Sequence, residues 1–263
     1  MFKFIKKLFV AIFATILLLP AVNAAPVLWV GDSSGKLGTV DVATGTVNVV
    51  GNMGAVMTDI AFDSSGNLWG ITFGSLYSID KATAASTYVG KLGTSLNSLV
   101  FGAGGTLYAA NNSLYTINTT TGTATNLGSG GDSYSSSGDL AFIGGELFLS
   151  STFGGDSLVK LDTATGAGTT IGVINALFVY GLASPDGNNL YGLAGTSIYS
   201  VNSTTGAGTL IRNYSGNGLG SAYGSAFISE ATPAVPVPAA LFMFAPALLG
   251  FFGLRRRAKD IVA

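Results

Sequence analysis

Hydrophobic and polar positions repeat along this chain with a period of about forty residues. A leucine followed by an aromatic residue recurs five times, and the spacings between the aromatic residues are 40, 39, 40 and 43. Each step is followed by a second hydrophobic segment, a turn and a third hydrophobic segment. Four short strands in a period of this length are typical of a β-propeller blade. The five steps are Leu28-Trp29, Leu68-Trp69, Leu107-Tyr108, Leu147-Phe148 and Leu190-Tyr191.

The turn inside each repeat has the pattern Asp/Asn-x-x-Thr-Gly. Its first residue is Asp41, Asp80, Asn118, Asp162 or Asn202, and only the second copy lacks the glycine. An Asp or Asn side chain can accept a hydrogen bond from the backbone two residues on, and glycine adopts a positive φ without strain. Repeated cation binding is the alternative interpretation. Because Asn replaces Asp in two copies without disturbing the pattern, we interpret these residues as turn caps.

A fourth strand precedes the aromatic step in every repeat except the first. These strands begin at Asp59, Ser98, Asp139 and Gly181, and the missing copy appears at the far end, as residues 224–227. A strand displaced to the end of the repeats is how a propeller closes its ring, whereas a linear solenoid would not need it. The sequence therefore predicts an all-β, five-bladed β-propeller over residues 25–230, closed by a C-terminal strand that completes the first blade.

Two groups of aromatic residues have different expected roles. The regular series Trp29, Trp69, Tyr108, Phe148 and Tyr191 could stack on sugars, but its fixed place within strands favours packing between blades. Irregular aromatic residues lie outside the repeat pattern, several of them in the longer insertions 129–138 and 213–223. Loops on a rigid scaffold commonly carry binding residues. We therefore take the following as ligand-binding candidates: Tyr134, Phe178, Tyr180, Tyr214 and Tyr223.

The N-terminus has the three parts of a secretory signal peptide. Lys3, Lys6 and Lys7 are followed by an apolar stretch and then by small residues that end at Ala24. We expect a signal helix over residues 1–24, cleaved after Ala24. An uncleaved signal anchor is the alternative.

The C-terminus carries a second hydrophobic segment with a basic end. A Pro-rich linker over residues 231–238 leads into an apolar segment within residues 239–263, and basic residues close it. From Ala239 to Leu254 a helix would be about 24 Å long, short of a hydrocarbon core about 30 Å thick. The positive-inside rule would keep the basic cluster in the cytoplasm. The residues that carry this pattern are Val235, Pro236, Val237, Pro238, Ala239, Arg255, Arg256 and Arg257.

This arrangement resembles the PEP-CTERM sorting signal of exported Gram-negative proteins, in the variant with a hydrophobic third residue. The resemblance implies export through the inner membrane and a membrane-bound, exosortase-like sorting protease as a partner. It also implies processing near Pro238, which would leave the mature protein in the cell envelope or extracellular matrix. A permanent single-span anchor is the alternative.

Composition narrows the chemistry of the exported domain. The chain contains no Cys and no His, which excludes Ser-His-Asp and Cys-His catalysis and histidine-ligated zinc. Between Ala25 and Pro238 there are five basic and twelve acidic residues, a net charge of −7. Nucleic acid is therefore not an expected partner, because its recognition needs a basic surface.

Asp59 and Asp139 are the candidate cation ligands. Both begin predicted inner strands near one mouth of the central channel, and carboxylates are preferred Ca²⁺ ligands. No other cofactor and no catalytic residue is predicted. The sequence favours a non-enzymatic binding module for glycans or surface proteins. A Ca²⁺-assisted, lactonase-like hydrolase and a purely structural envelope protein are the alternatives.

Overall fold

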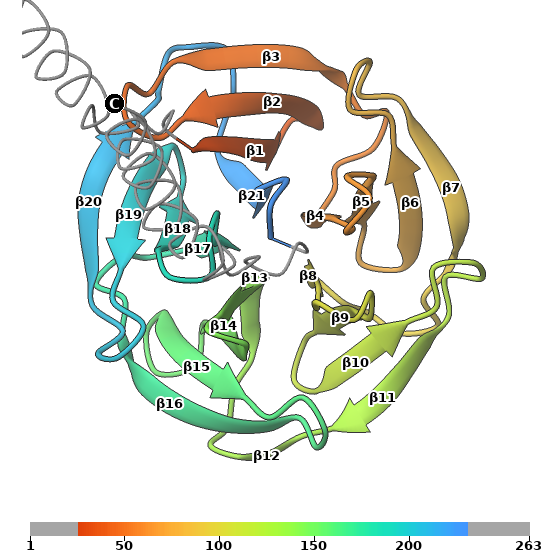
Figure 1. Cartoon of the computed structure of the whole chain (residues 1–263), viewed down its shortest axis with the longest axis vertical. Coiled ribbons are helices and arrows are strands. Elements are labelled where there is room, and N and C mark those ends of the chain that lie inside the picture. Colours follow the sequence, from red (N-terminus) through yellow and green to blue (C-terminus); the bar gives the residue numbers. More distant parts are fainter. Residues whose placement is uncertain (1–25, 231–263) are drawn as a thin grey trace, which may run out of the picture.

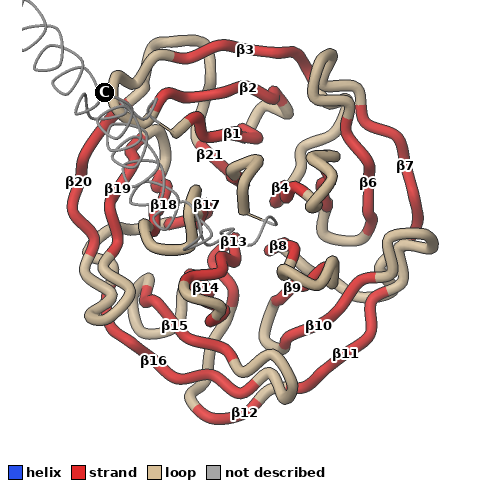
Figure 2. Tube along the Cα trace, in the orientation of Figure 1, coloured by secondary structure: helices blue, strands red, loops and turns tan. Residues whose placement is uncertain are grey.

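The computed structural model describes residues 26–230, which form five antiparallel sheets arranged around a central axis (Figure 1). Every regular element in this range is a strand, with loops between them (Figure 2). None of the described residues forms a helix that could cross a membrane. The predicted all-β, five-bladed propeller is therefore confirmed. The predicted signal helix, the linker, the sorting motif and the C-terminal apolar segment lie outside the described residues.

Each blade has the expected strand order, from the inner strand at the axis to the outer strand at the rim. Blade 2 contains β4 (Asp59–Phe62), β5 (Leu68–Ile71), β6 (Ser75–Ile79) and β7 (Ser86–Lys91). Blade 3 contains β8 (Ser98–Phe101), β9 (Leu107–Ala110), β10 (Leu114–Ile117) and β11 (Ala124–Gly128). Blade 4 contains β13 (Ser136–Ile143), β14 (Glu146–Ser151), β15 (Ser157–Leu161) and β16 (Ala167–Val173), with the short β12 (Gly130–Gly131) parallel to β16. Blade 5 contains β17 (Val179–Ala183), β18 (Leu190–Ala194), β19 (Ser197–Val201) and β20 (Gly208–Asn213).

Blade 1 joins the two ends of the described chain. It contains β1 (Val27–Asp32), β2 (Lys36–Asp41) and β3 (Val47–Asn52), and its inner strand is β21 (Ala222–Ala226) from the other end. The register pairs Trp29 with Ala226 and Gly31 with Gly224. The predicted ring closure by the displaced strand is therefore confirmed.

The regular aromatic series packs between blades, as predicted. Trp29 of blade 1 meets Phe62 of blade 2 edge to face, with ring centroids 5.6 Å apart. The same contact recurs between Trp69 and Phe101. It is repeated at two further seams, by Tyr108 with Phe142 and by Tyr191 with Phe227. Aromatic pairs of this geometry stabilise a fold beyond the area they bury.

The repeated turns have the predicted caps. The Asp41 carboxylate accepts hydrogen bonds from the backbone N–H and the hydroxyl of Thr44, and equivalent bonds form in the other copies. Gly45 has a φ of 77°, and the turn of blade 2 places Ala84 at 66° instead. Ala84 is completely buried. These acidic residues therefore serve the turns, and the turn that lost its glycine adopts the same left-handed conformation with an alanine.

Candidate functional site

The two predicted cation ligands meet at the centre of the ring. Asp59 from β4 and Asp139 from β13 are both completely buried, and their carboxyl groups hydrogen-bond to each other. Gly224 occupies the matching position in blade 1, where a Cβ would overlap the backbone of Asp59. Side chains from two blades therefore fill the axis, and a third blade leaves room for them.

Hydrogen bonds from this pair reach the inner strands of all five blades. Asp59 accepts the backbone N–H of Leu99 in blade 3 at 2.5 Å. Asp139 accepts the N–H of Leu182 in blade 5 at 2.6 Å and the hydroxyl of Ser225 in blade 1 at 3.0 Å. Each carboxyl also accepts the N–H of the residue that follows it. The pair therefore satisfies buried donors that the ring would otherwise leave unpaired.

Both carboxyl groups favour the protonated form. Burial raises the pKa of Asp59 well above its ordinary value, and the neighbouring charge of Asp139 raises it further. Burial also raises the pKa of Asp139, against the opposing effect of its hydrogen bonds. Two carboxylates in contact cannot both ionise cheaply away from water. We infer that they share at least one proton at neutral pH.

No cluster of three or more Asp or Glu side chains that could hold a metal is present within residues 26–230. The oxygens of Asp59 and Asp139 already accept backbone and hydroxyl donors, and neither residue is exposed. Ca²⁺ binds six to eight oxygen ligands. The geometry of the pair therefore suits a structural hydrogen-bond network better than a cation site.

One face of the ring carries the longer loops. The segments between an outer strand and the next inner strand, including residues 129–135 and 214–221, all lie at the end of the ring where the inner strands begin. We call this the entry face. Large apolar side chains are exposed on its loops: Phe73 (61%), Phe153 (60%), Leu177 (69%) and Phe178 (61%).

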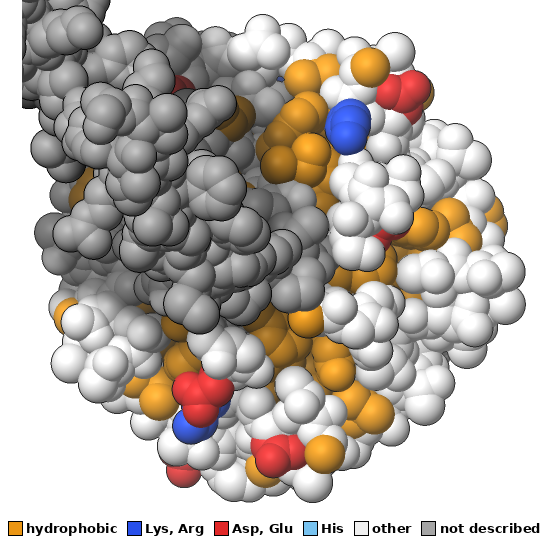
Figure 3. All heavy atoms as spheres, viewed as in Figure 1, with side chains coloured by type: hydrophobic (Ala, Val, Ile, Leu, Met, Phe, Trp, Pro, Cys, Tyr) orange, Lys and Arg blue, Asp and Glu red, His pale blue; other side chains and the backbone are white. Residues whose placement is uncertain are grey.

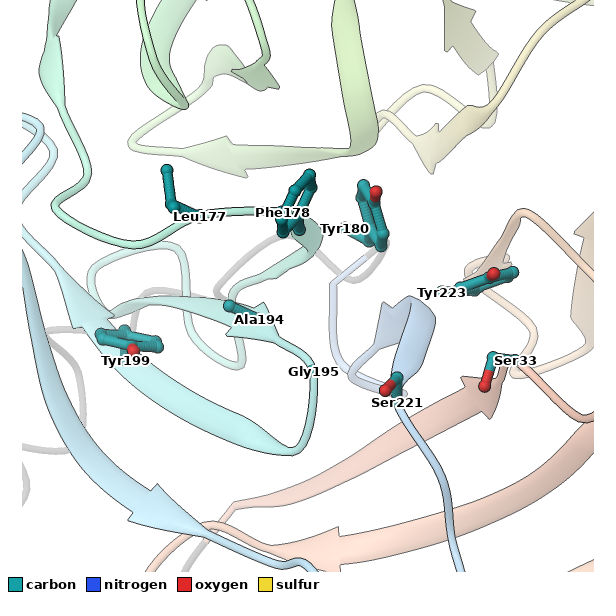
Figure 4. A pocket seen from close by; sticks show the side chains of 9 residues that line it. All are labelled: Ser33, Leu177, Phe178, Tyr180, Ala194, Gly195, Tyr199, Ser221 and Tyr223. Atoms are coloured by element: carbon teal, nitrogen blue, oxygen red, sulfur yellow. The ribbon is translucent and has the colours of Figure 1, made fainter.

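Three of the five predicted ligand-binding residues form a row on the entry face. Tyr180 from β17 lies between Phe178, with ring centroids 6.0 Å apart, and Tyr223 from β21, 5.8 Å apart and perpendicular to it. Figure 4 shows the three rings beside one another along a pocket, with Leu177 at its end. The structure thus brings blades 5 and 1 together in one aromatic row.

Two cavities adjoin this row. The first, of about 560 Å³, is the one in Figure 4; it extends between blades 5 and 1, and we call it the side groove. The second, of about 340 Å³, has lining residues from every blade and therefore lies over the axis. We call it the axial pocket. It is lined by Thr58 and Phe73 from blade 2, Asn97 from blade 3, Ser137, Gly138 and Thr152 from blade 4, Tyr180 from blade 5, and Tyr223 from blade 1.

The backbone beside the aromatic row is strained. Phe178 has a φ of 62°, a conformation that bulky residues rarely adopt. Its N–H donates to Asp156 Oδ2 at 2.9 Å, and Asp156, itself at a φ of 49°, accepts the Ser137 hydroxyl through Oδ1 at 3.0 Å. One carboxylate thus fixes both the Phe178 loop and a wall of the axial pocket. Non-glycine residues in such conformations concentrate at functional sites.

The other two predicted ligand-binding residues lie in the interior. Tyr134 donates its hydroxyl to the Gly166 carbonyl at 2.8 Å and packs among buried leucines and valines. Burial raises the pKa of Tyr134 to about 12. Tyr214 is completely buried, and its hydroxyl lies 3.3 Å from the Gly195 and Gly220 carbonyls. Sequence position alone did not distinguish these loop-anchoring tyrosines from surface ones.

The opposite face has a different character. Figure 3 shows one face of the ring, on which the described charged side chains are few and scattered. At the end of the described chain, Glu230 accepts the backbone N–H of Ser184 in blade 5 at 2.7 Å and that of Phe227 at 3.2 Å. Burial, and then the charge of Asp139, raise the pKa of Glu230. Sequence analysis did not single out this carboxyl, which joins blades 5 and 1.

Comparisons with known proteins establish the fold. No protein-family model and no curated protein matches the chain. A protein of unknown function from Bacteroides thetaiotaomicron is similar at 16% identity and a TM-score of 0.54, over 80% of this chain and 64% of its own length. A chain of the nidogen/laminin complex is similar at 13% identity and a TM-score of 0.53, over 79% of this chain and 100% of its own.

A gluconolactonase from Xanthomonas campestris is similar at 16% identity and a TM-score of 0.49, over 73% of this chain and 78% of its own. At that TM-score nothing about catalysis follows for the present chain. The present chain is a five-bladed β-propeller.

Proposed function

We propose that this protein is an exported, non-enzymatic binding module that recognises a glycan or surface protein through its entry face. The aromatic row of Phe178, Tyr180 and Tyr223 carries the proposal. Pockets lined mainly by apolar and aromatic groups, with a few polar groups, are the usual ligand sites of proteins. Exposed apolar side chains gathered on one face likewise mark interaction surfaces.

The distribution of charge supports binding rather than hydrolysis. Neither the side groove nor the axial pocket is lined by a described Asp, Glu, Lys, Arg or His side chain. The acid pair is completely buried one residue below the pocket lining formed by Thr58 and Gly138. General acid–base catalysis needs a titratable group within reach of the substrate, and neither cavity supplies one.

Export and sorting complete the proposal. The signal peptide would direct the chain across the inner membrane, and the C-terminal segment would hold it for an exosortase-like protease. The ring is complete at β21, before the Pro-rich linker begins. Cleavage near Pro238 would therefore leave the binding face and the ring intact.

The test uses the full-length protein, labelled and purified in mild detergent. We expect retention on cell surfaces or on at least one envelope polysaccharide, and a marked loss in the Tyr180→Ala/Tyr223→Ala variant. Tyr88→Ala is the matched control, because Tyr88 is 53% exposed on the outer strand β7, away from the entry face.

Absence of retention on every surface and polysaccharide would contradict the binding role and favour a purely structural envelope protein. A Ca²⁺-dependent lactone hydrolysis lost in folded Asp59→Ala and Asp139→Ala variants would instead establish the hydrolase alternative.

A further inference from the structure

The axial pocket offers hydrogen-bond acceptors. The Thr58 hydroxyl donates to the Ile71 carbonyl at 3.1 Å, and the Ser137 hydroxyl donates to the Asp156 carboxylate at 3.0 Å. Neither acceptor has a hydrogen to give, so the hydroxyls must be the donors. The Thr152 hydroxyl is committed in the same way to the Ser135 carbonyl at 3.3 Å. A hydroxyl that has donated its hydrogen can only accept from a ligand.

Asn97 adds an acceptor that no described residue satisfies. Its Nδ2 donates to the Ser136 carbonyl at 3.0 Å, which fixes the orientation of the amide, because the reversed amide would place two oxygens together. Oδ1 is thereby buried without a hydrogen-bond donor among residues 26–230. A buried acceptor without a donor costs about 1–3 kcal/mol. A donor that enters the pocket would remove that cost.

The aromatic and uncharged surroundings define what kind of donor fits. Tyr180 and Tyr223 line both cavities, so a ligand seated over the axis can continue along the aromatic row into the side groove. A desolvated cation needs a countercharge, and no carboxylate lines either cavity. A sugar ring instead offers several hydroxyl donors and an apolar face that packs against aromatic rings.

We propose that the axial pocket is the primary subsite for a neutral sugar residue, which donates hydroxyl hydrogens to Asn97 Oδ1 and packs on Tyr180 and Tyr223. The rest of the saccharide extends into the side groove. This inference rests on the proposed binding function and assigns its ligand to neutral saccharides.

The test measures binding of free sugars to the full-length protein in detergent, by saturation-transfer NMR and calorimetry. The probes are glucose, galactose, mannose and N-acetylglucosamine, with glucuronic acid and tetramethylammonium as charged comparisons. We expect at least one neutral sugar to bind. Asn97→Leu should weaken it by about tenfold, the loss of one buried hydrogen bond of about 1.4 kcal/mol.

Asn111→Leu is the matched control, because Asn111 also donates its Nδ2 to a carbonyl, that of Ser95 at 3.1 Å, but does not line the axial pocket. Thermal unfolding checks that Asn97→Leu folds. If it does not, Thr152→Val makes the same test at a more exposed position and should also weaken the sugar.

Unchanged affinity in folded Asn97→Leu would overturn the assignment, and so would binding of tetramethylammonium in place of the sugars. Failure of every free sugar, with full-length protein still retained on cell surfaces, would also overturn the subsite while leaving the proposed function standing. Loss of both would remove the binding function itself.

Discussion

The shared proton of the axial carboxyl pair predicts how stability depends on pH. Because the pKa of Asp59 is raised in the folded state, its contribution is fully present below the unfolded pKa of about 3.9 and is lost as pH rises through the folded value. Asp59→Asn replaces the protonated carboxyl by a neutral amide of the same shape, which can donate to Asp139 but does not titrate.

The magnitude follows from the proton count. Each proton retained by the folded state and released on unfolding lowers the free energy of unfolding by about 1.4 kcal/mol per pH unit. Asp59→Asn also loses one acceptor for the N–H of Ile60 or Leu99, a cost of about 1 kcal/mol that does not depend on pH. We therefore expect the variant to gain about 1.4 kcal/mol on the wild type for each pH unit from 5 to 7.

The assay is urea unfolding at a series of pH values, followed by the fluorescence of Trp29 and Trp69. Asp63→Asn is the control, because hydrogen bonds from Asn67 and Trp69 outweigh burial and lower the pKa of Asp63, which is thus ionised in both states across this range. A difference between wild type and Asp59→Asn that does not change with pH would refute the shared proton. Stabilisation of wild type by Ca²⁺, abolished by the same substitution, would replace it with a cation site.

Three other outcomes are expected. Gly224→Ala should destabilise the ring by about 3 kcal/mol or more, because its Cβ would overlap the Asp59 backbone, whereas a Cβ at Gly104 meets nothing within 4 Å and Gly104→Ala should be neutral or slightly stabilising in the same denaturation assay. Tyr214→Phe should cost about 1 kcal/mol by thermal unfolding, because it removes a buried hydroxyl shared by two carbonyls, and sugar binding should not change. Mass spectrometry of the mature protein should find no peptide from residues 251–263, and recovery of that basic tail would indicate a permanent anchor.

The sequence was sufficient for the fold because each repeat states its own strands. The leucine-aromatic steps, the capped turns and the inner strands are local patterns, and their fivefold recurrence fixed the blade count. The displaced strand before Ala231 then fixed ring closure, because only a closed ring gives it a partner, β1. Even the turn that lost its glycine was legible, since Ala84 occupies the same place in the repeat.

The site depended on distances that no local pattern carries. Asp59 and Asp139 are eighty residues apart in sequence, and only the ring brings their carboxyl groups together and seals them from solvent. Tyr214 and Tyr223 looked alike in sequence, yet packing buries the first and leaves the second on the aromatic row. Sequence by itself thus determined the repeat, the ring and the expected address of this protein. The tertiary structure alone decided that its axis is a buried acid pair and that its candidate binding surface is an uncharged aromatic face, because burial and long-range contact are properties of the closed ring.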